Sequence, residues 1–166
     1  MSMHPWFALR VKPKHEKTAA TAVSAKGYES FLPVYLSRRK YGDRFKNLHM
    51  PLFGGYFFAR LDPQDRLPIL TIDSIVGILG NGKELVSIPD NEISALQATV
   101  ESRLAVQLHP FLNVGDRVTV NEGPLRGAEG ILVKLKGRDH LVVSVTLLQR
   151  SISVQIERGW VKPAVQ

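Results

Sequence analysis

One segment of the chain imitates a nucleotide-binding motif. Residues 77–83 have the sequence GILGNGK, which satisfies the G-x-x-x-x-G-K part of a phosphate-binding P-loop. A P-loop continues with a Ser or Thr that binds Mg²⁺, and with a helix whose N-terminus receives the phosphates. Here Glu84 follows, a carboxylate that would repel the γ-phosphate, and residues 85–89 have an extended pattern. The sequence therefore favours a glycine turn between strands over a nucleotide site.

The remaining reactive residue types form no pattern typical of an enzyme. The five histidines are scattered, and His15-Glu16 lacks the second histidine four residues later that a zinc protease helix requires. The chain has no Gly-x-Ser-x-Gly nucleophile elbow and no cysteine. We therefore expect a protein that is not an enzyme and that holds no metal or cofactor.

The charge of the chain indicates a polyanionic partner. The formal net charge is +7 and the sequence pI is about 9.9. Five cations lie within nine residues, opposed there only by Asp43: Arg38, Arg39, Lys40, Arg44 and Lys46. Such a run can bind nucleic acid through phosphates, which needs no sequence code. Charge alone slightly favours the alternative, a solvated loop between strands.

Length and composition fit one globular domain or two small ones. Hydrophobic residues make up 44% of the 166 residues and charged residues 22%, so extensive disorder is not expected. No apolar run approaches the ~20 residues that cross a membrane, and residues 1–5 lack the features of a signal peptide. We expect a cytoplasmic protein without a membrane anchor, and the absence of cysteine fits that location.

The first 104 residues predict an α+β domain, a mixed or antiparallel sheet with helices packed on it. Helices are expected over 14–26, ending at Gly27; from Asp62-Pro63, shortened by Pro68; and from about Pro89, with apolar residues at 93, 96, 100 and 104. Strands are expected over 6–12, 31–40, 45–52, 55–61 and 75–79. The strand over 55–61 is the most apolar and is therefore expected at the centre of its sheet.

The pattern changes after Leu104. Residues 105–113 lack periodicity and predict a linker. Strands are then expected over 117–120, 130–135, 141–146 and 151–156, separated by turn signals at 121–124 and 136–139. Four or five short strands in so few residues predict a small all-β barrel that closes its own edges.

The C-terminal part resembles a KOW domain. The matching text is VGDRV at 114–118, NEGPLRGAEGILV at 121–133 and RSISVQI at 150–156. In this resemblance Gly123 forms the turn, and Gly130 is the family's central glycine, at a place where a side chain would clash. KOW domains also occur in ribosomal proteins, so this motif alone leaves a KOW-containing RNA-binding or ribosome-associated protein open.

The N-terminal part is similar to the N-terminal domain of NusG. The matching text is WFALRV at 6–11, FLP at 31–33 and PLFGGYFFA at 51–59, where Gly54 replaces the family's usual proline. The resemblance to the NusG/RfaH family of transcription elongation and antitermination factors spans nearly the whole chain. It implies a polymerase-binding domain over 1–104, a linker over 105–113 and an SH3-like KOW barrel over 114–166.

The resemblance implies how such a protein works. The N-terminal domain would dock on the clamp helices of the RNA polymerase largest subunit through Phe53 and Tyr56, with Trp6 nearby or in the core. Bridging the cleft would favour the closed polymerase and suppress pausing. Lys12 matches a basic position of RfaH-like members near upstream or non-template DNA, and the basic run at 38–46 is a second candidate. The factor is expected to be a monomer.

The KOW barrel would recruit a second partner, in this family a small-subunit ribosomal protein or Rho. The segment concerned carries Leu147, Leu148 and Arg150, and Leu148 stands where housekeeping NusG has a phenylalanine. Residues 68–71 do not match the lobe contact of RfaH. These departures favour a specialised antiterminator over a housekeeping factor that couples to Rho or the ribosome. The β-branched residues over 131–133 and 142–145 favour a permanent barrel over the helical hairpin that RfaH stores.

Overall fold

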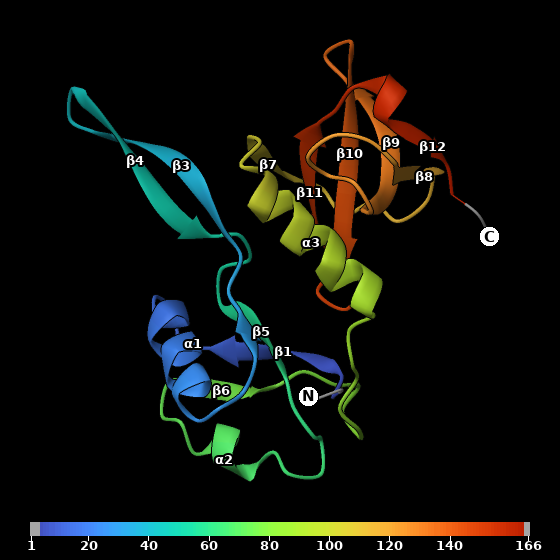
Figure 1. The fold of residues 1–166 in the computed structure, drawn as a ribbon. Coiled ribbons are helices and arrows are strands. Elements are labelled where there is room, and N and C mark those ends of the chain that lie inside the picture. The colour runs from blue at the N-terminus through green and yellow to red at the C-terminus, as the bar shows by residue number, and fades with distance from the viewer. Residues whose placement is uncertain (1–3, 165–166) are drawn as a thin grey trace. The chain divides into compact units, whose positions relative to one another are not determined.

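The protein folds as two compact units. A computed structural model describes residues 4–164, shown in Figure 1. The first unit contains the chain up to Val34 together with His49–Asp90, and the second contains Tyr35–Leu48 together with the chain from Asn91 on. Within residues 4–164 no helix is long and apolar enough to cross a membrane.

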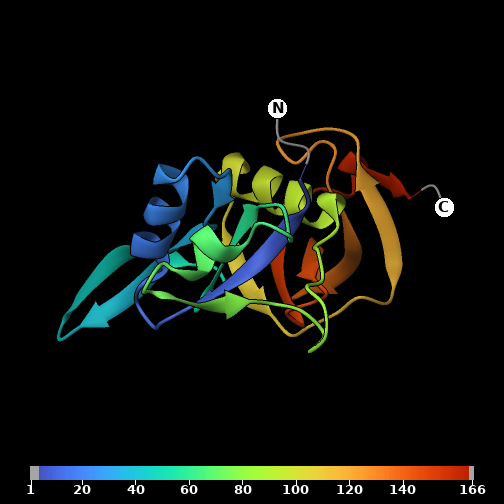
Figure 2. The ribbon, with the colours of Figure 1, turned by 90° about the horizontal axis from the view of Figure 1, so that it is seen from below.

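The first unit is built on a four-stranded antiparallel sheet with the order β2-β5-β1-β6. The long strands β1 and β5 pair over their whole length, and β6 lies beside β1 (Figure 2). The prediction that the apolar strand over 55–61 is central is confirmed, since β5 pairs with both β1 and β2. The bounds are β1 Trp6–Val11, β2 Ser30–Phe31, β5 Tyr56–Arg60 and β6 Ile75–Ile78.

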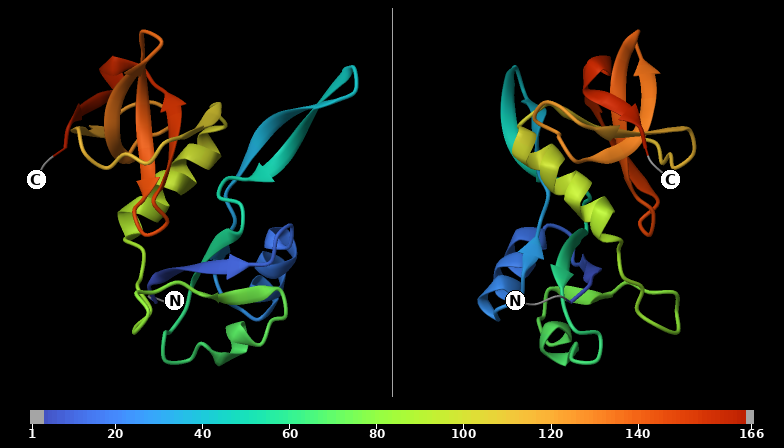
Figure 3. Two further views of the ribbon diagram at one scale, coloured as in Figure 1. Left: turned by 180° about the vertical axis from the view of Figure 1, so that it is seen from behind. Right: turned by 45° about the vertical axis from the view of Figure 1, so that its right-hand side comes forward.

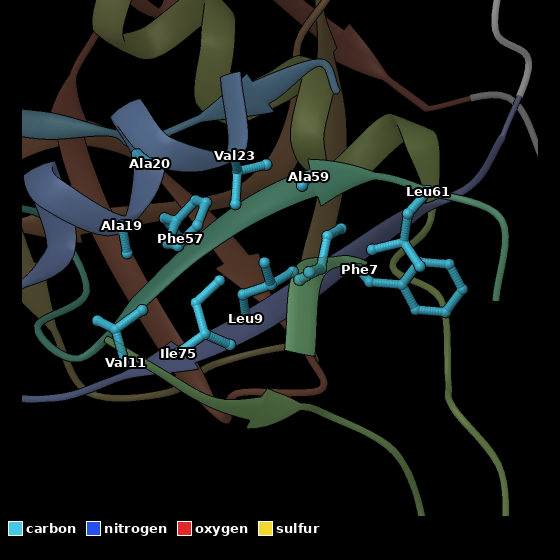
Figure 4. Close-up of a cluster of buried hydrophobic side chains, with 11 residues drawn as sticks. Phe7, Leu9, Val11, Ala19, Ala20, Val23, Phe57, Ala59, Leu61 and Ile75 are labelled. Atoms are coloured by element: carbon cyan, nitrogen blue, oxygen red, sulfur yellow. The ribbon is translucent and has the colours of Figure 1, made fainter. Parts of the chain in front are cut away.

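One face of this sheet forms the core of the unit with two helices, α1 (Glu16–Ala25) and α2 (Leu67–Leu70). Alternate residues of a strand point to the same face, so Phe7 and Leu9 of β1 meet Phe57 of β5 there. The close-up in Figure 4 shows these side chains together with those of α1. The whole cluster consists of Phe7, Leu9, Val11, Ala19, Ala20, Val23, Phe57, Ala59, Leu61, Ile69 and Ile75.

Two local predictions for this unit were wrong. Asp62-Pro63 does not start a helix, because the Asp62 Oδ1 accepts a hydrogen bond from the Gln64 backbone N–H at 3.0 Å and forms an Asx turn instead. Helix α2 begins only at Leu67, with Pro68 in its first turn, where a proline is tolerated. The strand predicted over 31–40 is divided, since β2 ends at Phe31 and β3 begins at Val34.

The segment that imitates a P-loop is a tight turn, as expected. Gly80 and Leu85 form a β-bridge, and residues 84–89, directly after Lys83, are not helical. The Asn81 side-chain oxygen accepts hydrogen bonds from the backbone N–H groups of Lys83 at 3.0 Å and Glu84 at 2.9 Å. A phosphate would need those N–H groups, so the turn already uses the donors that a P-loop offers to its ligand.

Strands β3 (Val34–Tyr41) and β4 (Arg44–Pro51) form a separate two-stranded sheet, the hairpin drawn in cyan in Figure 3. Two residues, Gly42 and Asp43, connect them. Gly42 has φ +60°, which suits the first central position of a type II′ turn, where glycine is favoured.

The second unit contains a six-stranded antiparallel sheet with the order β12-β8-β9-β10-β11-β7. The expected C-terminal strands are present, within a few residues of their predicted bounds. Residues 106–109, predicted as part of a linker, instead form strand β7 and pair with β11. The bounds are α3 Asp90–Ser102, β7 Val106–His109, β8 Asp116–Val120, β9 Glu129–Leu135, β10 Arg138–Val145, β11 Arg150–Gln155, the 3₁₀ turn Arg158–Trp160 and β12 Val161–Pro163.

Candidate functional site

The second face of the four-stranded sheet carries the aromatic residues singled out from the sequence. The register of β1 and β5 places Trp6 opposite Arg60, Ala8 opposite Phe58 and Arg10 opposite Tyr56. Because side chains alternate, these residues share one face, opposite the face of Phe57. Tyr56 and Phe58 therefore lie on the same side of β5, which separates Phe58 from the helix-covered core that holds Phe57.

The aromatic residues of this face differ in their exposure. Phe58 stacks on Phe31 at 6.2 Å between ring centroids and meets Phe53 edge-on at 6.3 Å. Phe53 is 1% exposed and Trp6 is 2% exposed, so both lie in the interior. Tyr56 and Phe31 are only half-buried. Tyr56 is thus placed to touch a partner, whereas Phe53 supports this face from within.

Hydrogen bonds hold the turn that carries Phe53 and Tyr56. The Tyr56 N–H donates to the Phe53 carbonyl at 3.0 Å, and Gly55 has φ +87°, a conformation that L side chains rarely adopt. The Gly55 N–H donates to the Glu16 Oε2 at 2.8 Å, and Glu16 is only 7% exposed. Sequence reasoning missed Glu16, since nothing in its local pattern indicates a buried carboxylate that reaches 39 residues along the chain.

Arginine side chains border the aromatic residues at both ends of this face. The Arg60 guanidinium lies over the Trp6 ring at 4.8 Å and forms ion pairs with Glu29 at 3.3 Å and Asp90 at 3.9 Å. Arg10, opposite Tyr56, is exposed. The cross-strand register was the missing information for both arginines, because they become neighbours of the aromatic residues only after β1 and β5 pair.

The predicted nucleic-acid-binding residues occupy two places. Lys12 directly follows β1 and forms an exposed ion pair with Asp73 at 3.5 Å. The five cations of the basic run all lie on the β3–β4 hairpin, and all are exposed: Arg38, Arg39, Lys40, Arg44 and Lys46. The run is solvated, as the alternative expected, but it is part of a paired β-ribbon rather than a loop between strands.

The predicted partner-binding residues of the second unit surround the turn between β10 and β11. Leu147 and Leu148 are half-buried and Arg150 is exposed at the start of β11. The turn is closed by Gln149, whose φ is +54° and whose N–H donates to the Thr146 carbonyl at 3.0 Å. The Glu92 carboxylate of α3 accepts hydrogen bonds from the Thr146 N–H at 3.2 Å and from its Oγ1 at 2.8 Å. These bonds connect α3 to the turn.

The two glycines singled out for the C-terminal sheet are closely surrounded. A Cβ on Gly130 would lie 2.5 Å from the Val142 backbone oxygen, and one on Gly123 would lie 3.0 Å from the Trp160 ring. Gly123 also has φ +82°. Both positions therefore accept glycine alone without displacement of a neighbour.

A polar cluster in the same sheet was not expected from the sequence. The Leu112 N–H donates to the Ser151 Oγ at 3.0 Å, and the Ser144 Oγ donates to the Leu112 carbonyl at 2.7 Å. The two serine hydroxyls also contact each other. Paired in register on β10 and β11, they hold the chain at Leu112 against the sheet. Single serines in strands give no sequence signal for such a role.

Comparison with known proteins identifies the family. The family described as "Transcription termination factor nusG" matches residues 4–97, more than half of the chain. No curated protein matches the chain. A structure of Thermotoga maritima NusG, titled for its domain interaction, is similar in fold, with a TM-score of 0.53 at 19% identity over 97% of each chain. Two conformations of an MjSpt4:Spt5 complex match at 17% identity over 97% of this chain and 97% and 99% of theirs, with TM-scores of only 0.32 and 0.33. The chain belongs to the NusG family of transcription factors.

Proposed function

We propose that the protein binds RNA polymerase through the sheet face that carries Tyr56, and that it suppresses pausing or termination. The observation that carries this proposal is the half-exposed Tyr56 at the end of a buried aromatic cluster, next to the exposed Arg10. Tyr and Arg are the side chains that most often dominate a protein interface, because they combine apolar area with hydrogen-bonding groups.

The firmness of the turn supports a docking role. The bonds from Gly55 to Glu16 and from Tyr56 to Phe53 fix the backbone that leads into Tyr56. A backbone that is already ordered loses less conformational entropy when its side chains bind a partner. The clamp helices of the polymerase largest subunit are the partner that we propose for this face, with Phe53 and Trp6 holding the face from within.

The action that we propose is bridging rather than catalysis. A factor that binds the closed, DNA-engaged polymerase more tightly than the open one shifts the population towards the closed state. Lys12 and the basic hairpin would meanwhile contact upstream or non-template DNA through phosphates. Phosphate contacts give affinity without sequence specificity, so recruitment to a given transcript would need a further signal.

The C-terminal residues provide a second binding place in this proposal. We assign residues 114–166 to a KOW domain with an SH3-like barrel and residues 1–104 to a polymerase-binding domain, with strand β7 added to the edge of the C-terminal sheet. Leu147, Leu148 and Arg150 are the proposed contacts with a ribosomal protein or Rho. The leucine side chains offer less apolar area than the phenylalanine of housekeeping NusG, which favours a specialised antiterminator.

A single-round transcription assay with purified polymerase tests the proposal. Wild type is expected to shorten pauses, Tyr56→Ala to lose that effect, and Tyr56→Phe, which keeps the ring, to retain most of it. Polymerase binding by each variant is measured in parallel by co-sedimentation. Absence of polymerase binding by wild type would overturn the proposal and favour a KOW-type RNA-binding protein.

A further inference from the structure

The β3–β4 hairpin has cations on both of its faces. The Arg38 guanidinium lies over the Phe45 ring at 4.1 Å and the Lys40 Nζ lies 6.0 Å from the same ring, so these two cations share the face of Phe45. Because side chains alternate along a strand, the neighbouring cations point to the opposite face. That second face carries Arg39, Arg44 and Lys46.

The positive charge of the hairpin is not neutralised within the protein. Of the ion pairs found among residues 4–164, none includes one of these five cations. Asp43, in the turn, is the only carboxylate between Arg38 and Lys46. All nine residues of this segment are exposed. A ribbon that is positive on both faces attracts a polyanion that can surround it.

The dimensions of the ribbon fit the major groove of B-form DNA. That groove is about 12 Å wide and about 8.5 Å deep, and it admits a two-stranded β-ribbon. With a rise of about 3.3 Å per residue, a depth of about 8.5 Å takes in two to three residues of each strand next to the turn. Those residues are 39–41 of β3 and 44–46 of β4, the part of the hairpin in which the cations are densest.

We propose that the tip of this hairpin enters the major groove of double-stranded DNA. Arg38 and Lys40 then contact the phosphates of one strand, and Arg39, Arg44 and Lys46 contact those of the other. The inference deepens the nucleic-acid contact of the proposed function, and it is independent of polymerase docking at Tyr56. A groove explains cations on two faces, whereas a flat binding platform would use only one.

The other forms of nucleic acid fit the hairpin less well. A single strand stacks its bases on the aromatic rings of one face. Phe45 is 56% exposed, with Arg38 over one side of its ring, but a strand stacked there would leave the cations of the opposite face unused. The major groove of A-form RNA is deep and narrow, so side chains cannot enter it. The major groove of B-form DNA is wider, so it can take in the Tyr41 side chain, which is 57% exposed beside the turn.

Binding of the full chain to a 20-base-pair fluorescent DNA duplex, without polymerase and over a series of salt concentrations, tests the proposal. Each variant removes two cations from one face, Arg38→Gln with Lys40→Gln, or Arg39→Gln with Lys46→Gln. The control removes the same charge from two exposed positions, one in α1 and one at its C-cap, Lys17→Gln with Lys26→Gln. Circular dichroism verifies that every variant is folded.

Loss of two cations from either face is expected to lower the salt slope of log K by about 1.8, since each phosphate contact contributes about 0.9. At 0.1 M salt the same loss corresponds to roughly sixtyfold weaker binding, while the control is expected to change affinity by less than about threefold. A dependence on one face alone would overturn the groove arrangement, as would single-stranded DNA or duplex RNA bound as tightly as duplex DNA.

A footprint with dimethyl sulfate gives an independent readout. The reagent methylates guanine N7, which lies in the major groove. Wild type is expected to protect N7 and both face variants to lose the protection; an unprotected N7 at saturating protein would refute major-groove entry. If the protein does not shorten pauses but binds duplex DNA through the hairpin, only the polymerase proposal is refuted. If it shortens pauses through Tyr56 but does not bind duplex DNA through the hairpin, only the major-groove proposal is refuted.

Discussion

A methyl group added at Gly130 tests whether close contact between β9 and β10 stabilises the second unit. In Gly130→Ala the new Cβ would lie 2.5 Å from the Val142 backbone oxygen and 2.9 Å from the Leu141 Cδ1. Neither neighbour can move easily. The oxygen belongs to a paired strand, and Leu141 is completely buried. The substitution therefore has to displace β10 relative to β9.

Two effects of opposite sign determine the magnitude. Replacing glycine with alanine in a strand gains about 0.5–1 kcal/mol, because the unfolded chain loses conformational freedom. Overpacking of a well-filled interior costs about 1–3 kcal/mol, and the backbone clash puts Gly130 at the upper end of that range. The clash outweighs the entropy gain, so we expect a net loss of about 2 kcal/mol in the free energy of unfolding.

Urea denaturation followed by tryptophan fluorescence measures this loss. Each unit holds one of the two tryptophans, so a Trp6→Phe background leaves Trp160 as the reporter of the second unit. With a slope of about 1–2 kcal/mol per molar urea, the midpoint is expected to fall by about 1–2 M. Gly159→Ala is the matched control, because its Cβ would meet nothing within 4 Å. Equal midpoints for the two variants would refute the reasoning.

Two further changes test hydrogen bonds that the sequence did not indicate. Glu16→Ala removes the acceptor of the Gly55 N–H, and we expect unfolding to become about 1–3 kcal/mol easier and polymerase binding weaker; Glu16→Gln, which keeps an acceptor oxygen, should recover most of both. A Glu16→Ala protein with the stability of wild type in urea would contradict this role. Ser151→Ala removes the acceptor of the Leu112 N–H, so we expect faster hydrogen exchange of that amide and a loss of about 1–2 kcal/mol. Ser94→Ala, at an exposed position of α3, is the control, and an unchanged exchange rate in Ser151→Ala would show that the bond contributes nothing.

The parts of the fold that the sequence predicted are those with local signals. The sequence of β5 is apolar without polar alternation, which indicated a strand covered on both faces. Phe57 and Phe58, which point to opposite faces, are both completely buried. The spacing of Ala19, Ala22 and Val23 indicated α1, and Gly27 has the positive φ that ends such a helix. Turn residues likewise indicated where the strands of the second unit begin and end.

The parts that failed depend on tertiary contacts, or on local signals that two structures share. Val106–His109 carries no periodicity and becomes a strand only because β11 offers a free edge for pairing. The exposure of Phe53 could not be judged either, since its burial depends on how the turn before β5 brings its ring edge-on to Phe58. Asp62 misled the helix prediction because an aspartate before a proline is equally typical of an Asx turn and of a helix cap.

The exposure of the aromatic residues decides which substitution can report on polymerase contact. Phe53 is 1% exposed, and its truncation to alanine would remove buried area worth about 3–5 kcal/mol, so lost activity would be explained by unfolding. Tyr56 is half-buried and its backbone is held by other residues, so its truncation leaves the turn bonds intact. A Tyr56→Ala protein that unfolds at the urea concentration of wild type but no longer shortens pauses would therefore assign the lost activity to contact rather than to folding.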